Sequence, residues 1–152
     1  MAPRDFDVLY SDDVRYEVGG KVSYIGCYNG ELWVKDFPLT LPKLCVTLWA
    51  RIPHSNPVES LIFRVFKNDE LLHEQNANIA DVPQAHSADF WEQQRPSDME
   101  TFTMLMTTVI FSPMLLEDAC YIRVRAFTSD GDELKAPALH IRIAPPEFKE
   151  FL

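Results

Sequence analysis

Two turn dipeptides in the first third of the chain constrain its fold more strongly than any other feature. Gly19-Gly20 and Asn29-Gly30 each separate short runs that are rich in β-branched and aromatic residues. Glycine and asparagine readily adopt the left-handed backbone conformation that two-residue hairpin turns require. The pattern therefore predicts an antiparallel meander of three strands, at residues 14–18, 21–28 and 31–36.

The register that follows from these turns divides the meander into two faces. With two residues in each turn, one face carries the side chains of Val14, Tyr16, Val18, Ile25, Cys27, Leu32 and Val34. The two turns assign their registers independently, and agreement on one apolar face is expected when that face packs on a core. This face is therefore predicted to point inwards.

The opposite face of the predicted meander is aromatic at its centre. Gly26 is placed opposite Trp33, with Tyr24 and Tyr28 beside it on the same strand. Two interpretations remain open. The Trp33 ring can cover the gap that a glycine leaves in a sheet. Alternatively, Tyr24, Tyr28 and Trp33 form a surface that binds a protein partner, because tyrosine and tryptophan are favoured at the centres of interfaces.

Apolar runs predict further strands in the rest of the chain. They lie at residues 44–52, at 60–66 and 71–74 (joined as a hairpin), at 102–111, and on either side of Asp130-Gly131. The run at 102–111 is interpreted as a central strand. Pairing across the Asp130-Gly131 turn places these residues on a core side: Ile122, Val124, Ala126, Leu139 and Ile141. Pro137 predicts that the last strand lies at an edge or begins after this residue.

The segment before the last hairpin favours a particular arrangement of these strands. Tyr121 follows Leu115 and Leu116 by six and five positions, which is similar to the tyrosine corner of immunoglobulin-like sandwiches. We therefore predict an all-β fold, a two-sheet antiparallel β-sandwich (immunoglobulin-like or C2-like) of seven to nine strands. The 152 residues are near the commonest domain size, so residues 1–152 are expected to form a single domain with a short tail at 145–152.

One long loop is expected at residues 76–99, where no periodicity is sustained. Connections of this length inside a domain are usually functional or mobile. Phe90 and Trp91 are candidate partner-binding residues in this loop, and His86 with Asp89 is its one local pair of chemical interest. Apart from a short helical turn around residues 88–94, no regular secondary structure is predicted in this loop.

The composition of the chain argues against several classes of function. The balance of 14 basic and 23 acidic residues gives a net charge of −9, which disfavours general binding to nucleic acid. Cys27, Cys45 and Cys120 are widely spaced and form no CxxC pair, which predicts neither a zinc site nor a disulfide framework. No apolar run reaches the length of a signal peptide or a membrane helix. We expect a cytoplasmic protein with no membrane contact.

Catalytic motifs are missing from the sequence. It contains no GxSxG, SxxK or HExxH pattern, so we predict a non-enzymatic protein without catalytic residues, metal or cofactor. Acidic clusters at Asp12-Asp13 and at residues 130–133 suggest a calcium site, but acidic side chains in solvated turns explain both clusters.

One cationic stripe stands out on this acidic chain. It consists of Arg123, Arg125, His140 and Arg142, which share the outer side of the last hairpin. Arginines at this spacing are candidates for binding a carboxylate, a phosphate or an acidic partner loop. The alternative is that they pair with neighbouring acids on the surface, where each pair contributes little.

The segment DDVRYEVGGKVSYIGCYNGELWVKDFPLTLPKLCV resembles an uncharacterised family of small bacterial and phage proteins. In that family a similar GGK hairpin, an IG near the middle strand and an FPxxLPxL connection open a β-rich domain. The resemblance covers about the first half of the chain, up to Glu74. It implies a bacterial or phage-infected cytoplasm, and it brings no assigned activity or catalytic residues.

These observations predict a protein-binding module. In a phage or mobile element, such a protein would suit inhibition of a host protein such as a defence nuclease. A first alternative is a small hydrolase or anionic-ligand-binding protein, with a pocket between the 76–99 loop and the arginine stripe. A second alternative is a structural subunit of a phage particle. The sequence does not predict the oligomeric state.

Overall fold

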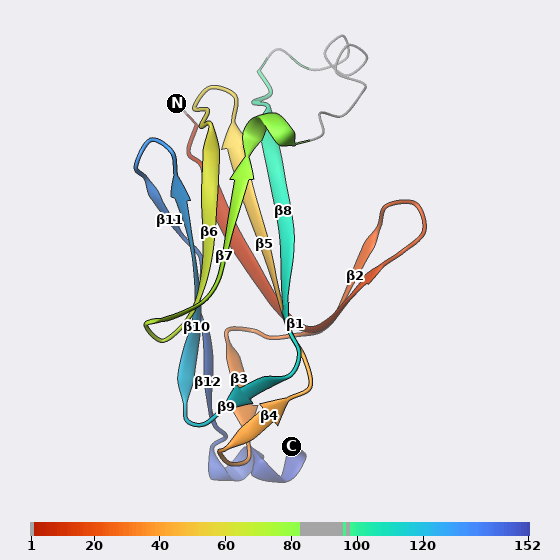
Figure 1. Ribbon diagram of the computed structural model, residues 1–152. Coiled ribbons are helices and arrows are strands. Elements are labelled where there is room, and N and C mark those ends of the chain that lie inside the picture. The colour runs from red at the N-terminus through yellow and green to blue at the C-terminus, as the bar shows by residue number, and fades with distance from the viewer. Residues whose placement is uncertain (1, 83–95, 97) are drawn as a thin grey trace.

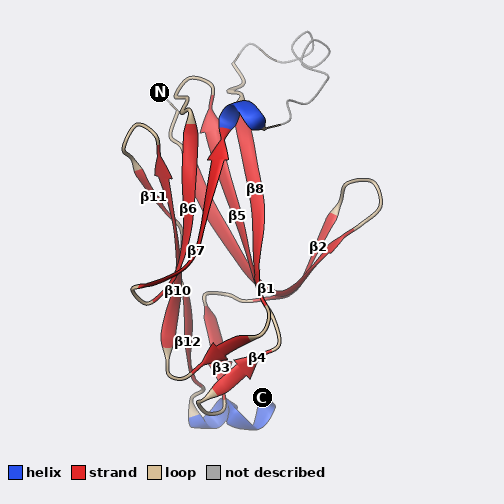
Figure 2. Cartoon of the chain, in the orientation of Figure 1, coloured by secondary structure: helices blue, strands red, loops and turns tan. Residues whose placement is uncertain are grey.

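The computed structural model describes residues 2–82, 96 and 98–152, and it consists of two packed β-sheets with a small third sheet at one end (Figures 1 and 2). One sheet has the strand order β2-β1-β5-β8. Its strands are β1 (Asp5–Tyr16), β2 (Val22–Cys27), β5 (Leu44–Pro53) and β8 (Phe102–Phe111). We call this sheet A, and the all-β sandwich-like fold predicted from the sequence is confirmed.

Sheet B faces sheet A across the core. Its order is β3-β12-β10-β6-β7, and β11 also pairs with β10. The strands are β3 (Glu31–Val34), β6 (Ser60–Lys67), β7 (Glu70–Asn78), β10 (Cys120–Thr128), β11 (Glu133–Lys135) and β12 (Leu139–Ile143). The third sheet pairs β4 (Leu39–Leu41) with β9 (Met114–Leu116). The described strands number twelve in place of the predicted seven to nine, mainly because these short strands lack a pattern of their own.

The core forms where alternate side chains of the two sheets meet. In β5, residues 44, 46, 48, 50 and 52 are fully buried or nearly so, as the alternation predicts. In β10, Ile122, Val124 and Ala126 are fully buried and face them. Phe6 of β1 stacks on Phe63 of β6 with ring centroids 5.9 Å apart, which joins the two sheets directly. Alternate side chains thus point into the core between the two sheets. On the other side of β5, Cys45 and Thr47 are fully buried as well.

The first predicted hairpin exists, but its register differs from the prediction. The Glu17 N–H donates to the Lys21 carbonyl over 2.8 Å, so the turn contains residues 18–20 rather than two glycines alone. Val14 therefore pairs with Tyr24 instead of Ile25. The end of the hairpin extends away from the body (Figure 1), and Tyr16 and Val18 are 74% and 94% exposed. The predicted inward face is therefore wrong for the hairpin, whereas Val34 is buried and Leu32 packs against the core, as predicted.

The second predicted hairpin does not form. At Asn29-Gly30 the chain crosses from sheet A to sheet B: the Tyr28 N–H donates to the Tyr10 carbonyl, and the His140 N–H donates to the Gly30 carbonyl. β3 then pairs in parallel with β12. An Asn-Gly turn specifies a sharp change of direction but not which strand is paired next, which is why the meander prediction failed.

Three further predictions need correction. β8 is the edge strand of sheet A among the described strands, not a central one. Tyr121 forms no tyrosine corner, because its ring lies on the surface and stacks on His140 with centroids 4.3 Å apart. The predicted loop at 76–99 starts late, since β7 continues to Asn78 and is followed by a 3-10 turn at Ile79–Asp81.

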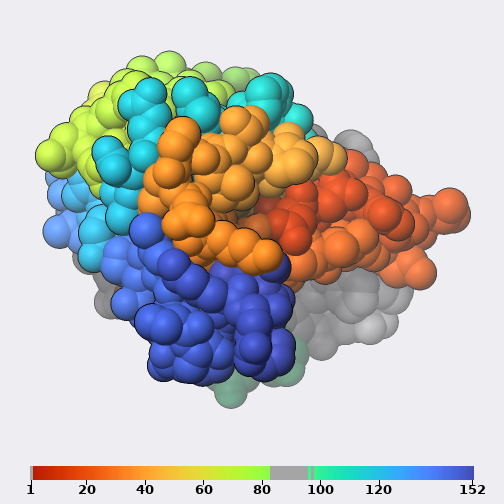
Figure 3. Space-filling view, turned by 90° about the horizontal axis from the view of Figure 1, so that it is seen from below, coloured from red at the N-terminus to blue at the C-terminus, as the bar shows by residue number. Residues whose placement is uncertain are grey.

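The hairpins of the second half follow the sequence pattern. β6 pairs with β7 around residues 68–69, and β10 pairs with β11 across Asp130-Gly131. Leu139 and Ile141 of β12 are buried against the core, and β12 begins after Pro137, as predicted. The tail forms a 3-10 helix, η2 (Pro146–Phe151), at the end of the molecule shown in Figure 3.

Candidate functional site

The predicted aromatic residues do not share one face. Tyr24 lies over the outer face of sheet A, whereas Trp33 belongs to sheet B and Tyr28 lies in the connection between the sheets. Gly26 has φ +65° and lies against the Asp12 side chain rather than opposite Trp33. The shared aromatic face is therefore wrong. The other two aromatic candidates, Phe90 and Trp91, lie outside the described residues.

Trp33 and Tyr28 are both engaged within the protein. The Trp33 Nε1–H donates to Glu31 over 2.8 Å, and its ring packs at 4.8 Å on Phe148 of η2. The packing of Trp33 on Phe148 holds η2 on sheet B. The Tyr28 hydroxyl donates to the Asp12 carboxylate, and burial together with this hydrogen bond raises the pKa of Tyr28. Both residues therefore have a structural role.

Each arginine of the predicted stripe pairs with a carboxylate. The pairs are Arg123 with Asp69 at 2.9 Å, Arg125 with Glu133 at 3.2 Å and Arg142 with Glu31 at 2.9 Å. His140 stacks on Tyr121 beside them. An incoming anion would have to displace these carboxylates. His86 and Asp89, which the pocket hypothesis also needs, lie outside the described residues.

The acidic cluster at the β10–β11 turn holds an internal cation. The Arg4 guanidinium lies 2.6 Å from Asp130 and 2.8 Å from Asp132, and its side chain is only 4% exposed. It also donates to the carbonyls of Asn56 and Pro57. The carboxylates of Asp130 and Asp132 are therefore paired with a cation from the chain itself. Hydrogen bonds from Arg4 and Thr128 lower the pKa of Asp130 to about 2.

The part of the chain that the structure describes contains neither a metal-binding cluster nor a membrane-spanning helix. Within it, no three His, Cys, Asp or Glu side chains are grouped so as to hold a metal ion. None of its helices has the length and apolar character needed to cross a membrane.

The sequence prediction missed a surface on the outer side of sheet A. The outward side chains of β8 include four large apolar groups, and all of them are exposed: Phe102, Met104, Met106 and Ile110, at 44% to 55%. The inward side chains Leu105 and Val109 of the same strand are buried. β8 is thus apolar on both sides, and one of these sides faces outwards.

Two aromatic residues extend this surface across the sheet. Trp49 of β5 pairs with Met106 of β8. Tyr24 meets the Trp49 ring edge to face at 5.7 Å, and its hydroxyl donates to the Met106 sulfur over 3.7 Å. Through Tyr24 the β1–β2 hairpin therefore contacts the outer side of sheet A. We call the set Tyr24, Trp49, Phe102, Met104, Met106 and Ile110 the apolar outer face.

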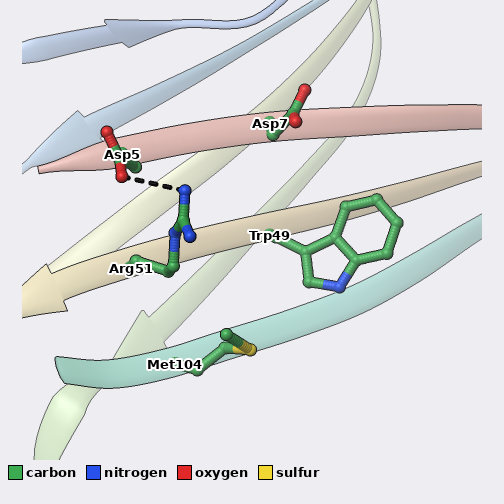
Figure 4. Close-up of a pocket in the computed structure, with 5 residues that line it drawn as sticks. All are labelled: Asp5, Asp7, Trp49, Arg51 and Met104. Atoms are coloured by element: carbon green, nitrogen blue, oxygen red, sulfur yellow. Dashed lines mark ion pairs between the residues drawn. The ribbon is translucent and has the colours of Figure 1, made fainter.

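A hollow of about 310 Å³ opens beside Trp49 and Met104 (Figure 4). Its other walls are Asp5, Asp7 and Arg51. Arg51 pairs with Asp5 at 2.9 Å. Asp7 is exposed, and its carboxylate accepts a hydrogen bond from the Val8 N–H at 2.8 Å but pairs with no cation among the described residues. The hollow therefore combines an indole, a thioether and one spare carboxylate.

Fold and surface together define an all-β protein of two packed sheets with an apolar outer face on one of them. No known protein-family model matches the sequence, and no curated protein shows significant similarity to it. The assignment of a function therefore depends on the geometry of the chain itself.

Proposed function

We propose that the protein is a non-enzymatic protein-binding module and that the apolar outer face is its docking surface. The observation that carries this proposal is the row of exposed apolar side chains on β8 next to Trp49 and Tyr24. Contiguous exposed apolar patches with polar surroundings mark interaction sites on soluble proteins. Methionine and aromatic residues are the types enriched in interface centres.

The shape of this region supports docking of a macromolecule. The sheet presents Trp49, Met104 and Met106 side by side, and the projecting β1–β2 hairpin flanks them through Tyr24 (Figure 1). A partner that rests on the sheet would also contact the hairpin. The central residues would then lose water on all sides, which is the condition under which interface residues contribute most.

The thiols support a binding role over nucleophilic catalysis. Burial raises the pKa of both Cys45 and Cys120, so the reactive thiolate form is disfavoured. The third cysteine, Cys27, is exposed and unpaired. Free thiols fit the reducing cytoplasm, which we take as the location of the protein.

The resemblance of the first half suggests a bacterial or phage-infected cell as the setting. There the partner would be a host protein such as a defence nuclease. Nucleases bind polyanions and so carry basic surfaces, and a chain of net charge −9 is complementary to such a surface. The same charge disfavours nucleic acid itself as the partner.

Affinity capture from bacterial lysate with matched variants tests the proposal. Met106→Glu places a charge on the apolar outer face, whereas Leu71→Glu makes the same change at an exposed leucine of β7 in sheet B. We expect wild type and Leu71→Glu to capture the same proteins and Met106→Glu to lose them. Capture that Met106→Glu leaves unchanged would contradict the proposal.

A structural subunit is the second candidate, favoured by the edge position of β8. An edge strand with an apolar outer row can pair with the same strand of a second copy. Light scattering separates the two functions. A defined oligomer that Met106→Glu converts to a monomer would favour the structural subunit, and a monomer at all concentrations would favour the binding module.

A further inference from the structure

The hollow at the end of the apolar outer face has an unequal distribution of charge. Asp7 lies directly across from Trp49 in the pairing of β1 with β5, and Asp5 lies across from Arg51. Directly opposed residues in antiparallel strands hold their side chains within contact distance. The Asp5–Arg51 pair, 2.9 Å long, is neutral as a unit. The net charge of the hollow is therefore −1, and it comes from the Asp7 carboxylate.

The wall opposite this carboxylate is suited to a cation. The Trp49 indole lines the hollow and presents the aromatic system that attracts cations most strongly. Met104 completes the wall with a flexible, polarisable thioether that adapts to an aliphatic chain. A ligand with an aliphatic stem and a cationic head matches both parts: the stem lies along Met104 and Trp49, and the head reaches Asp7.

The size of the hollow also limits what can occupy it. A volume of about 310 Å³ is at the lower end of the range for small-molecule pockets. One long side chain fits such a space, whereas a nucleotide-sized cofactor would not be enclosed. The hollow is open and adjoins the apolar outer face through Met104, so an occupant can be part of a larger partner.

From these observations we infer that the hollow accepts a lysine or arginine side chain of a basic partner protein. This inference rests on the proposed function, because it assumes that the apolar outer face is the docking surface. The partner would place an apolar patch over Met106 and Trp49 and one basic side chain between Asp7 and Trp49. The net charge of −9 provides the long-range attraction for such a partner.

Nuclear magnetic resonance on the isotope-labelled full chain tests the inference without knowledge of the partner. The probes are Nα-acetyl-lysine methylamide and Nα-acetyl-arginine methylamide, and the uncharged control is Nα-acetyl-norleucine methylamide. The signal followed is the Trp49 indole N–H, assigned from its loss in Trp49→Phe. We expect both cationic probes to shift this signal in a saturable manner and the norleucine probe to leave it in place.

Variants of the carboxylate sharpen the test. Asp7→Asn should weaken binding of the cationic probes about tenfold, because a charge-assisted contact to the carboxylate is lost. Asp7→Glu should restore binding. Asp36→Asn is the matched control, since it removes one exposed carboxylate from the loop after β3 and should leave the titration unchanged. If Asp7→Asn fails to fold, the wild-type titration at rising salt decides, because binding to a carboxylate weakens with ionic strength.

The outcomes separate this inference from the proposed function. Equal shifts with the norleucine probe, or a response that neither Asp7→Asn nor salt weakens, would overturn the inference. If Met106→Glu still abolishes partner capture in that case, the apolar outer face remains supported as the docking surface. Only the inference that a basic side chain enters the hollow is then rejected. If the cationic probes bind as expected but Met106→Glu captures the same proteins as wild type, the proposed function is wrong.

Discussion

Arg4 shows how much of this fold depends on a single side chain near the start of the chain. It contacts the turn after β10 through Asp130 and Asp132, and the connection after β5 through Asn56 and Pro57. A buried guanidinium needs such partners, because an unpaired buried charge is costly. In the sequence the two acids resemble ordinary turn residues, and nothing local predicts that they pair with a residue more than 120 positions away.

Removal of this side chain should destabilise the protein. Arg4→Ala deletes several charge-assisted hydrogen bonds at once, so we expect the free energy of unfolding to fall by about 2 kcal/mol. Urea denaturation measures the change. Arg15→Ala is the control, since Arg15 is exposed and its pair with Asp13 is long at 3.5 Å. A similar loss in both variants would argue against a special role for Arg4.

Asp130 predicts how stability depends on pH at the acid end. Its pKa is lowered to about 2 in the folded protein, whereas an aspartate in an unfolded chain titrates near 4. A lowered pKa contributes stability above the unfolded value, and this contribution is lost as pH falls towards the folded value. Asp130→Asn should therefore be less stable than wild type at pH 6, and the gap should close as the pH falls from about 5 to about 2.

At the scale of elements, local signals predicted local pairings well. The β6–β7 and β10–β11 hairpins have turn residues and alternation within a few positions of one another, and both form as expected. β3 was assigned to the wrong partner, because its neighbour β12 lies more than 100 residues away. The first half of β1 was missed altogether, although Phe6, Val8 and Tyr10 alternate with Asp5 and Asp7 there.

The candidate site was missed for a related reason. A strand that is apolar on both sides, as β8 is, is usually buried on both sides. The sequence therefore suggested a central strand, and nothing local indicates that one row of β8 faces outwards. Trp49 was recognised only as part of an alternating strand, since its neighbours Met104 and Met106 lie more than 50 positions away.

Gly26 provides a test of the β1–β2 hairpin. Its backbone has φ +65°, and an added Cβ would collide with the Asp12 side chain, which binds the Tyr28 hydroxyl. Gly26→Ala should cost at least about 2 kcal/mol of stability. Gly19→Ala is the matched control, because Gly19 also has positive φ but has open space around it, and it should cost only about 1 kcal/mol. Thermal unfolding of both variants measures the difference, and equal losses would remove the collision as the cause.

At the scale of the whole molecule, Tyr10 connects the two sheets through a hydrogen bond in the core. Its hydroxyl, carried by β1 of sheet A, lies 3.1 Å from the Ile122 carbonyl and 2.8 Å from the Pro137 carbonyl. Burial raises the pKa of Tyr10, so the hydroxyl stays protonated and can donate. The sandwich is therefore held by a polar contact as well as by its apolar core.

Loss of this hydroxyl should lower global stability. Tyr10→Phe keeps the ring but removes the hydroxyl that the carbonyls of Ile122 and Pro137 share, so we expect the free energy of unfolding to fall by about 1 to 2 kcal/mol in chemical denaturation. Tyr121→Phe makes the same change at an exposed ring and should have almost no effect. Equal stabilities of wild type and Tyr10→Phe would show that the contact contributes nothing to cohesion of the sheets.

β1 belongs to two structures at once. Its first half pairs with β5 inside sheet A, and its second half pairs only with β2 in the projecting hairpin; Ser11 faces both Cys45 and Cys27. The amide hydrogens of one continuous strand should therefore exchange with deuterium at two rates, slowly before Ser11 and quickly after it. A partner seated on Trp49 and Tyr24 would slow the fast half and turn the projecting hairpin into a reporter of occupancy.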